Sequence, residues 1–249
     1  MKQKNILFGI HAVLEALDSH QSISKIWIKK ASTHPLHKKI FFVAKERDIP
    51  VSQVPLPKLN YLTSGQHQGV VATLSPIHFS DLATVIQTTY EKGKNPLIVL
   101  LNKIEDTRNL GALIRTAVAA EVDAIVLPTK GSLPIDGMTM KTSAGMLLHM
   151  PICRVSDLVK SIQTLQENGI TVIACTEKAK VPYYQANFQN PTALLLGGEA
   201  AGITPRYLMM SEQQVTIPMQ EKVNSLNLSV ATSIILYEAV RQRTLNPHQ

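Results

Sequence analysis

Cysteine is scarce in this 249-residue sequence, which holds only two. Cys153 and Cys175 both lie in apolar surroundings, and neither has a Cys or His neighbour at metal-ligand spacing. Such cysteines are typical of buried thiols in a reducing compartment. The sequence therefore predicts neither a fold stabilised by disulfides nor a bound metal ion.

Long hydrophobic runs are missing as well. Runs such as LIVLL at 97–101 are far shorter than the roughly 20 apolar residues that span a bilayer. Near the N-terminus, the run ILFGIHAVLEAL is interrupted by His11 and Glu15, which argues against a secretion signal. We expect a soluble, cytoplasmic protein without a membrane partner. Hydrophobic residues make up 45% of the chain and charged residues 17%, which indicates a compact core.

Negative charge is sparse in the first third of the chain. Residues 1–75 hold ten Lys/Arg against four Asp/Glu, whereas residues 76–249 hold fifteen against fourteen. The first segment is therefore a candidate for binding a polyanion such as RNA. The alternative is that these lysines are ordinary solubilising surface charge.

Hydrophobic patterns divide the chain into two α/β domains joined by a linker. Residues 1–75 alternate helical patterns at 9–20 and 36–48 with strand patterns at 25–30, 50–55 and 69–74. Residues 76–95 are interpreted as a linker with room for one helix. In residues 96–249, strands are predicted at 97–101, 124–127, 170–175, 193–198 and 214–218, with helices at 110–121, 156–168 and 228–243. Apolar strands that alternate with helices predict a parallel sheet covered on both faces.

Ligands of such sheets bind beyond the carboxyl ends of the strands, which points to three loops. In the first, Asn109 can cap a helix beginning near Leu110, Gly111 allows a close approach, and Arg115 follows on an otherwise apolar helix. These features also fit a simple N-cap and an arginine with a buried stem.

The second loop, LLLGGEAAGITP at 194–205, has Gly197 and Gly198 at a strand end, followed by Glu199. It also fits a glycine turn into a helix that Thr204 and Pro205 begin. It is not a dinucleotide-binding fingerprint, because G-x-G-x-x-G is absent from the chain. The glycine-rich loop of ordinary Rossmann-type methyltransferases is absent too.

The third loop precedes a helix whose apolar side chains from 228 to 240 occupy nearly all faces. Such a helix is buried in its domain or against a second subunit. One helix cap needs one polar residue, yet this loop supplies Asn224, Ser225, Asn227 and Ser229. The surplus indicates a functional site.

Together the sequences of these loops resemble the motifs of the SpoU/TrmH branch of the SPOUT superfamily. The members of this branch are RNA ribose 2′-O-methyltransferases. The matching elements are N-x-G-A-x-x-R-T-A at 109–117, L-L-G-x-E-x-x-G at 195–202, and I-P-M followed by S-L-N-x-S-V-A within 217–231. GIHAVLEAL at 9–17, HQGVVA at 67–72 and KTSAG at 141–145 are similar to RlmB-type 23S rRNA (guanosine-2′-O)-methyltransferases. The resemblance covers nearly the whole chain.

The resemblance implies a small substrate-binding domain at 1–75 and a methyltransferase domain with a deep trefoil knot at 96–249. It further implies S-adenosylmethionine as cofactor, 23S rRNA as substrate and a homodimer formed through the knotted domain. The catalytic positions carried over are Asn109, Arg115, Glu199, Ser225 and Asn227. The cofactor positions carried over are Leu196, Gly197, Gly198, Ile217, Met219, Ser225 and Leu226.

The sequence departs from the family pattern at Ala200 and Glu221, where the motifs carry glycine, and also at Leu148 and Asn224. Two alternatives to an rRNA enzyme therefore stay open. One is a tRNA ribose 2′-O-methyltransferase. The other is an RNA-binding factor of the same fold with weakened catalysis.

Overall fold

The computed structural model describes residues 5–131, 133–198, 202–220, 222–223 and 225–245. The departures at Ala200, Glu221 and Asn224 and the predicted site residue Glu199 lie outside these residues. The chain forms two compact units. The first comprises Met1–His78 with Pro134–Met138, and the second comprises Phe79–Leu133 with Thr139–Gln249.

In the smaller unit, the described residues form a sheet with strand order β1-β4-β2-β3. Its strands are β1 (Ile6–Phe8), β2 (Ile23–Lys29), β3 (Val51–Val54) and β4 (Val70–Leu74). Its helices are α1 (Ile10–Asp18), α2 (Pro35–Glu46) and α3 (Leu56–Leu62). Strands β2 and β3 are parallel, and β4 is antiparallel to both β1 and β2. The predicted elements are confirmed, and β1 and α3 are additions to them.

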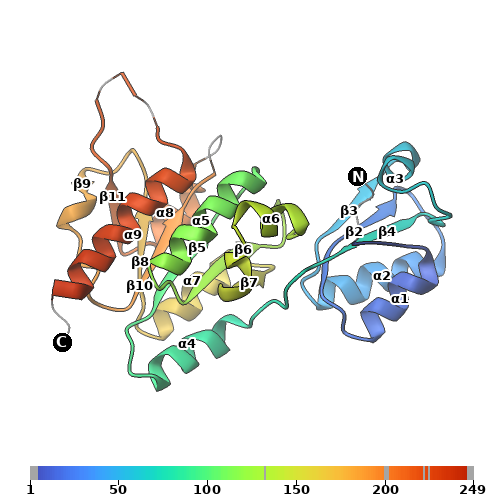
Figure 1. Cartoon of the computed structure of the whole chain (residues 1–249), viewed down its shortest axis with the longest axis horizontal. Helices are drawn as coiled ribbons and strands as arrows, with labels where there is room; N and C mark the ends of the chain where they lie inside the picture. Colours follow the sequence, from blue (N-terminus) through green and yellow to red (C-terminus); the bar gives the residue numbers. More distant parts are fainter. Residues whose placement is uncertain (1–4, 132, 199–201, 221, 224, 246–249) are drawn as a thin grey trace. The chain divides into compact units, whose positions relative to one another are not determined.

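The core of the smaller unit lies between the sheet and the pair α1 and α2 (Figure 1). Helix α3 lies on the other side of the sheet, next to β2 and β4. His37 of α2 connects the loop before this helix to the loop before β4. Its Nε2 donates to the Gln68 carbonyl at 3.0 Å, and its Nδ1 lies 2.6 Å from the Ser32 hydroxyl.

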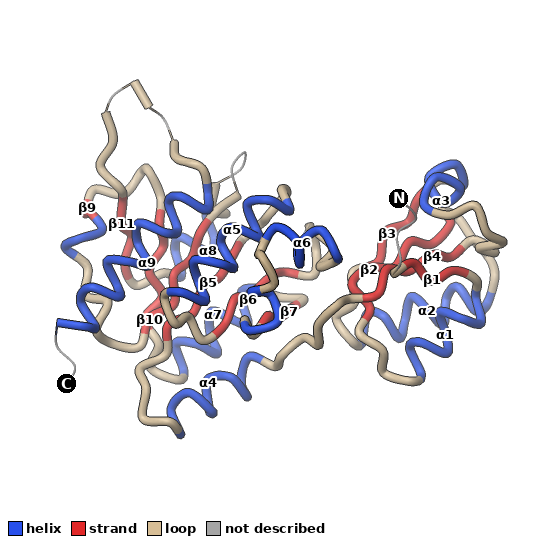
Figure 2. Tube along the Cα trace, in the orientation of Figure 1, coloured by secondary structure: helices blue, strands red, loops and turns tan. Residues whose placement is uncertain are grey.

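In the larger unit, the described residues form a sheet of seven parallel strands in the order β7-β6-β5-β10-β8-β11-β9 (Figure 2). The strands are β5 (Leu97–Leu101), β6 (Ala124–Pro128), β7 (Ile152–Val155), β8 (Thr171–Cys175), β9 (Val181–Pro182), β10 (Thr192–Leu196) and β11 (Gln213–Thr216). The predicted parallel sheet is confirmed. Strands β7 and β9 are additions at its two edges.

Helices cover both faces of this sheet, as predicted. From Phe79 onward the helices are α4 (Leu82–Glu91), α5 (Thr107–Ala119), α6 (Gly137–Thr142), α7 (Leu158–Glu167), α8 (Pro205–Met210) and α9 (Leu228–Leu245), with short 3₁₀ turns at Met146–His149 and Tyr183–Gln185. Helices α4, α7 and α8 share one apolar core with Ile98 and Leu100 of β5. Helices α5 and α9 pack against each other on the opposite face (Figure 1).

The segment 76–95 contains α4, and Leu82 and Ile86 of this helix belong to the core of the larger unit. This helix is therefore packed on the sheet, and the division between the two units falls between His78 and Phe79.

The predicted beginning of α5 was wrong. The helix begins at Thr107, and its N-cap is Asp106, whose carboxylate accepts a hydrogen bond from the Arg108 backbone N–H at 2.7 Å. Asp106 is the N-cap instead of Asn109 because its side chain reaches this N–H group, which has no partner inside the helix. Asn109 therefore lies within the first turn, where its side chain is available for other contacts.

The close approach predicted at Gly111 is confirmed. A Cβ atom at this position would overlap Thr142, both its side chain and, at 2.7 Å, its main-chain carbonyl carbon. Gly111 therefore lets the segment that contains Thr142 lie directly against α5.

Cys153 and Cys175 are both free thiols. Burial raises the pKa of each to about 12, so both are protonated at neutral pH. In the part of the chain that the structure describes, no helix is long and apolar enough to cross a membrane.

Candidate active site

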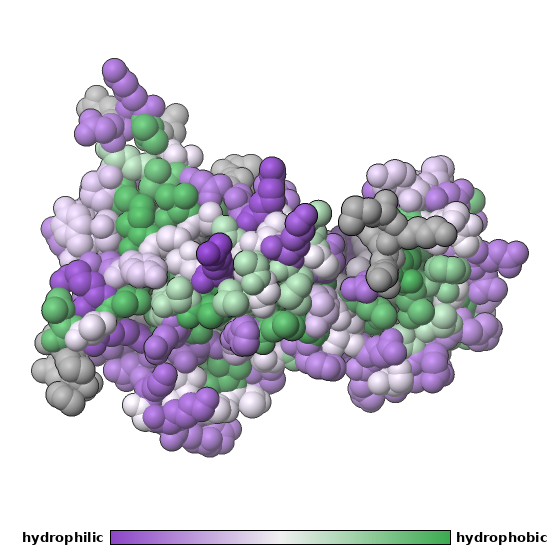
Figure 3. Space-filling view, viewed as in Figure 1, coloured by the Kyte–Doolittle hydropathy of each residue, from purple (hydrophilic) through white to green (hydrophobic). Residues whose placement is uncertain are grey.

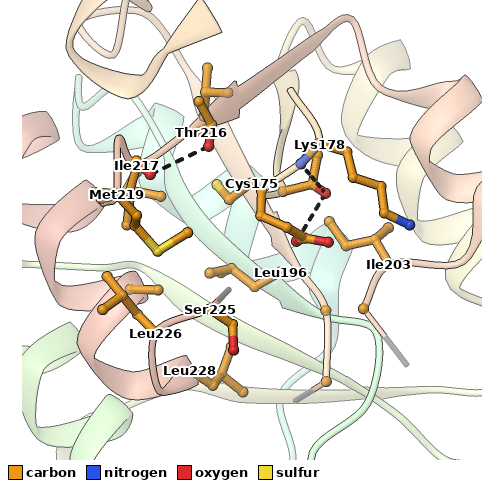
Figure 4. Close-up of a pocket in the computed structure, with 18 of the residues that line it drawn as sticks. Cys175, Lys178, Leu196, Ile203, Thr216, Ile217, Met219, Ser225, Leu226 and Leu228 are labelled. Carbon is orange, nitrogen blue, oxygen red and sulfur yellow. Dashed lines mark hydrogen bonds between the residues drawn. The ribbon is translucent and has the colours of Figure 1, made fainter. Parts of the chain in front are cut away.

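A pocket lies at the carboxyl ends of three neighbouring strands, β8, β10 and β11 (Figure 4). Its volume is about 300 Å³. Residues 225–235, from the loop before α9 and the first turns of that helix, complete the lining. Parallel strands end at the same edge of a sheet, so the loops that follow them converge there.

The walls of the pocket combine apolar and polar side chains. In Figure 4, Ile217, Met219 and Leu226 line one side, Ile203 and Lys178 lie on the other, and Leu196 lies between them. Polar side chains also contribute, and in small-molecule sites such groups fix the orientation of the ligand by directed hydrogen bonds.

All seven residues predicted to hold a cofactor line this pocket. They are Leu196, Gly197, Gly198, Ile217, Met219, Ser225 and Leu226. These residues come from two separate segments, the end of β10 with the turn after it and the loop between β11 and α9, and the fold brings them together at one edge of the sheet.

The glycine turn after β10 is closed by its own backbone. Gly198 and Gly202 form a β-bridge in which the Gly202 N–H donates to the Gly198 carbonyl at 2.9 Å. A Cβ atom on Gly197 would overlap the backbone of Gly202 and lie 2.5 Å from the nitrogen of Ile203. Gly197 therefore has to be glycine for the turn to pass this close.

Asn102 holds the same turn from the side, and it was missed in the sequence. Its Nδ2 donates to the Gly202 carbonyl at 2.9 Å, and its Oδ1 accepts from the Thr204 hydroxyl at 3.3 Å. Its backbone N–H also donates to the Leu196 carbonyl at 2.9 Å. The available signal was its place as the first polar residue after the buried strand LIVLL.

The loop after β8 was also missed. Cys175, Thr176, Glu177 and Lys178 all line the pocket. The sequence led us to predict sites after residues 101, 196 and 217 but not after residue 175. The signal was present, because a parallel strand predicted at 170–175 has to end at the same edge as its neighbours. The raised pKa of Cys175 makes this thiol an uncharged lining group and not a nucleophile.

Asn109 and Asn227 form a polar pair beside the pocket. The Asn227 Nδ2 donates to the Asn109 Oδ1 at 3.0 Å, across 118 residues of sequence. The Asn227 Oδ1 also accepts from the Ser229 backbone N–H at 2.9 Å, so Asn227 caps α9. Leu226 and Leu228, on either side of Asn227, both line the pocket.

The remaining predicted catalytic residues occupy different positions. Ser225 lines the pocket, whereas Glu199 lies outside the described residues. Arg115 is exposed on α5 and is not among the residues that line the pocket. The hydroxyl of the next residue on this helix, Thr116, accepts a hydrogen bond from Ser233 of α9 at 3.1 Å. The structure thus brings together Asn109, Asn227 and Ser225 and leaves Arg115 at the surface.

The described residues contain no group of three or more His, Cys, Asp or Glu side chains that could hold a metal ion.

Two family profiles match this sequence. The SpoU rRNA Methylase family matches residues 96–237, and the RNA 2′-O ribose methyltransferase substrate binding family matches residues 6–80. A putative TrmH family tRNA/rRNA methyltransferase of Staphylococcus haemolyticus is 35% identical over 238 residues, which are 96% of each chain.

Solved structures also resemble this chain. The AdoMet-bound rRNA methyltransferase from Sinorhizobium meliloti has a TM-score of 0.61 and 26% identity, over 95% of this chain and 87% of its own. The A. aeolicus TrmH/SpoU tRNA modifying enzyme has a TM-score of 0.55 and 26% identity, over 66% of this chain and 86% of its own. Because one profile covers more than half of the chain and a relative matches nearly all of it, this chain belongs to the SpoU/TrmH family of RNA ribose 2′-O-methyltransferases.

Proposed function

We propose that this chain transfers the methyl group of S-adenosylmethionine to the 2′-oxygen of a guanosine ribose in 23S rRNA. The observation that carries the proposal is the pocket at the strand ends, because it gathers all seven residues predicted from the sequence to hold the cofactor. Family membership and the AdoMet-bound S. meliloti relative support the same reaction.

The residues of the pocket suit S-adenosylmethionine. Its volume of about 300 Å³ is at the lower end of the range for small-molecule sites. Leu196, Ile217 and Leu226 offer apolar contact for a purine ring. The main chain at Gly197 and Gly198 carries no side chain, so a ligand can approach its N–H and C=O groups closely. When bound, S-adenosylmethionine supplies a methyl group already activated by its sulfonium charge.

The protein then has to align the ribose hydroxyl and remove its proton. Asn109 and Asn227 are placed to orient the ribose, because their amides hold each other at the border of the pocket. Ser225 lies on the same loop, within the lining. We assign Glu199 to this catalytic set on its motif position alone.

In this proposal Arg115 anchors a phosphate of the target nucleotide. Deprotonating a free arginine at neutral pH costs about 7–9 kcal/mol, which makes it a poor general base. Its planar guanidinium instead matches a phosphate in two hydrogen bonds. The exposed position of Arg115 on α5 is compatible with contact to a large substrate.

The variant Arg115→Lys tests this role, with Arg206→Lys on the exposed surface of α8 as control. We expect weaker RNA binding, measured by filter binding, with nearly unchanged turnover at saturating RNA. Loss of turnover with intact RNA affinity would contradict the anchoring role.

Ribosomal RNA is favoured over tRNA because of the smaller unit. The A. aeolicus tRNA modifying enzyme matches only 66% of this chain, whereas the S. meliloti rRNA methyltransferase matches 95%. Residues 6–80 of this chain match the substrate-binding family, and the chain is longer than the part that the A. aeolicus enzyme matches. The names of the curated relatives include both RNA classes, so tRNA is the second candidate.

We further propose that the chain is a homodimer through its C-terminal domain, and that this domain contains the trefoil knot implied by the resemblance. Helix α9 supports the dimer, because Val230 and Tyr237 are about half exposed on it, at 48% and 52%. Val223, in the loop before it, is 45% exposed. Figure 3 shows apolar surface in the region where α9 begins. A Val230→Glu variant should sediment as a monomer in analytical ultracentrifugation, whereas the parent chain should sediment as a dimer.

One experiment tests reaction and substrate together. The purified chain is incubated with labelled S-adenosylmethionine and total RNA from a strain that lacks the protein, and the methylated ribose is then mapped. A single guanosine in 23S rRNA is the expected outcome, and a methylated tRNA would transfer the proposal to the second candidate.

Calorimetry with S-adenosylmethionine separates an enzyme from a factor with weakened catalysis. Saturable binding is expected for the enzyme. Absence of binding by a folded chain would favour an RNA-binding factor that has lost its cofactor.

A further inference from the structure

Strand β2 of the smaller unit presents a basic and aromatic face that the pocket does not use. Its residues alternate between the two sides of the sheet. Ile26 and Ile28 are buried in the core with α1 and α2. Lys25 and Trp27 therefore face the opposite side, where α3 lies next to β2 (Figure 1).

On this face, two lysines each lie over an aromatic ring. The Lys25 Nζ lies 5.6 Å from the centre of the Trp27 ring, and the Lys58 Nζ lies 5.1 Å from the centre of the Tyr61 ring. The Tyr61 side chain is 82% exposed, so its ring is open to a ligand. We call these four residues, Lys25, Trp27, Lys58 and Tyr61, the stacking face.

The charges of the stacking face are all positive. Burial lowers the pKa of Lys25, and the nearby charge of Lys58 lowers it further. Neither lysine has an ion-pair partner among the residues that the structure describes. Within residues 5–78, the acidic residues lie in α1, in α2 or in the turn after α2, namely Glu15, Asp18, Glu46 and Asp48. An anion between the two lysines would relieve their mutual repulsion.

An exposed tyrosine and a half-buried tryptophan beside lysines match the chemistry of unpaired nucleotides. Bases that are not paired can stack on a tyrosine or tryptophan ring, while lysines bind the flanking phosphates. In a duplex the faces of the bases are stacked on one another, so a duplex would contact the two lysines through its phosphates and not the aromatic rings. The four side chains therefore fit a single strand better than a double helix.

We propose that the stacking face binds unpaired nucleotides of the RNA substrate, with a base stacked on Tyr61 and a phosphate held between Lys25 and Lys58. This inference rests on the proposed function, because it places the recognition of the same RNA on the smaller unit. It makes Tyr61 and Lys58 substrate-binding residues of the smaller unit.

The test uses the full chain and two probes, an oligouridylate of about 12 nucleotides, within the usual site size of single-strand binders, and an RNA duplex of similar length. Trp27 is the sole tryptophan of the chain, so its fluorescence reports on binding at this face. The variants are Tyr61→Leu and Lys58→Gln. The matched control is Phe42→Leu, because Phe42 is 63% exposed on α2, on the other side of the sheet.

We expect the oligouridylate to quench Trp27 and Tyr61→Leu to weaken its binding about 5- to 150-fold, the range for loss of one stacked base. Lys58→Gln should reduce the salt dependence of binding, and Phe42→Leu should change affinity less than about twofold. Duplex binding should respond to Lys58→Gln alone. Equal affinity of Tyr61→Leu and parent for the oligouridylate, or saturable binding without quenching, would overturn the proposal.

Methyl transfer by the same variants separates this inference from the proposed function. If the parent chain methylates rRNA and Tyr61→Leu does so with unchanged KM, the stacking face is refuted and the enzyme stands. If the parent binds the oligouridylate through Tyr61 but methylates no RNA, the proposed reaction is refuted and the stacking face stands.

Discussion

Arg243 connects the last turn of α9 to the beginnings of two central strands, and we expect its removal to destabilise the larger unit. Its guanidinium donates to the carbonyls of Phe188 at 2.8 Å, Asn95 at 2.7 Å, Pro96 at 3.1 Å and Asn190 at 2.9 Å. Burial lowers its pKa, with nearby Asp123 acting in the opposite direction. The charge is thus held by carbonyl groups in place of water.

The magnitude follows from these four hydrogen bonds. The bonds to Phe188 and Pro96 are partly buried, whereas those to Asn95 and Asn190 are exposed, so water can replace the latter two. A hydrogen bond to a charged group contributes about 1.5–3 kcal/mol, and the cost of burying the guanidinium offsets part of the sum. We therefore expect Arg243→Met, which keeps the apolar stem, to lower the free energy of unfolding by about 2–4 kcal/mol.

Urea unfolding measures this loss. With a slope of about 2 kcal/mol per molar urea, the far-UV circular dichroism midpoint of the larger unit should fall by about 1–2 M. Trp27 fluorescence reports the smaller unit and should change little. Arg206→Met, at an exposed arginine, is the control and should shift the midpoint by no more than about 0.3 M. A shift of that small size for Arg243→Met would refute the reasoning.

Three further predictions concern the pocket and the smaller unit. Gly197→Ala should weaken S-adenosylmethionine binding in calorimetry at least about fivefold, because the added methyl group overlaps the backbone of Gly202, whereas Gly137→Ala, with open space around its Cβ, should not. Asn227→Asp keeps the cap of α9 but loses the donor to Asn109, so methyl transfer should fall while hydrogen exchange in the first turn of α9 stays slow. Burial lowers the pKa of His37, so the unfolded chain takes up a proton at a higher pH than the folded chain. The stability that neutral His37 contributes is therefore complete above the unfolded pKa of about 6.5 and is lost as the pH falls below that value. The Trp27-detected urea midpoint should therefore drop between pH 7.5 and 5.5 in the parent and less in His37→Gln; an equal drop in both would contradict this assignment.

Fold class was predictable from the sequence because the central strands are uninterrupted apolar runs. LIVLL and its parallel neighbours are buried on both faces, and few other structures accommodate such runs. The elements that were missed carry weaker patterns. Strand β9 has two residues, and the first residues of α3 are flanked by Pro55 and Pro57, which are typical of turns. In β7, Arg154 interrupts the apolar pattern. The structure accommodates it by placing its guanidinium carbon 3.9 Å from the centre of the Phe79 ring.

The site was predictable where several polar residues gathered in one loop. Ser225 and Asn227 were visible in this way, and both lie at or beside the pocket. Asn102 was not, because a lone asparagine after a strand carries no signal until its partners 100 and 102 residues away are known. The N-cap of α5 was misassigned for a related reason. Asp106 and Asn109 are both good caps, and only the path of the backbone decides between them.

The chain is synthesised from its N-terminus, and this order determines when the pocket becomes complete. Strands β8, β10 and β11, whose ends form the floor of the pocket, leave the ribosome first. The wall formed by residues 225–235 follows later. Arg243 then contacts Asn95 and Pro96, made 148 and 147 residues earlier. A nascent chain that ends before residue 225 has the floor of the pocket without this wall. We therefore expect that ribosome-bound chains cannot hold the methyl donor until these late residues have emerged and α9 has docked.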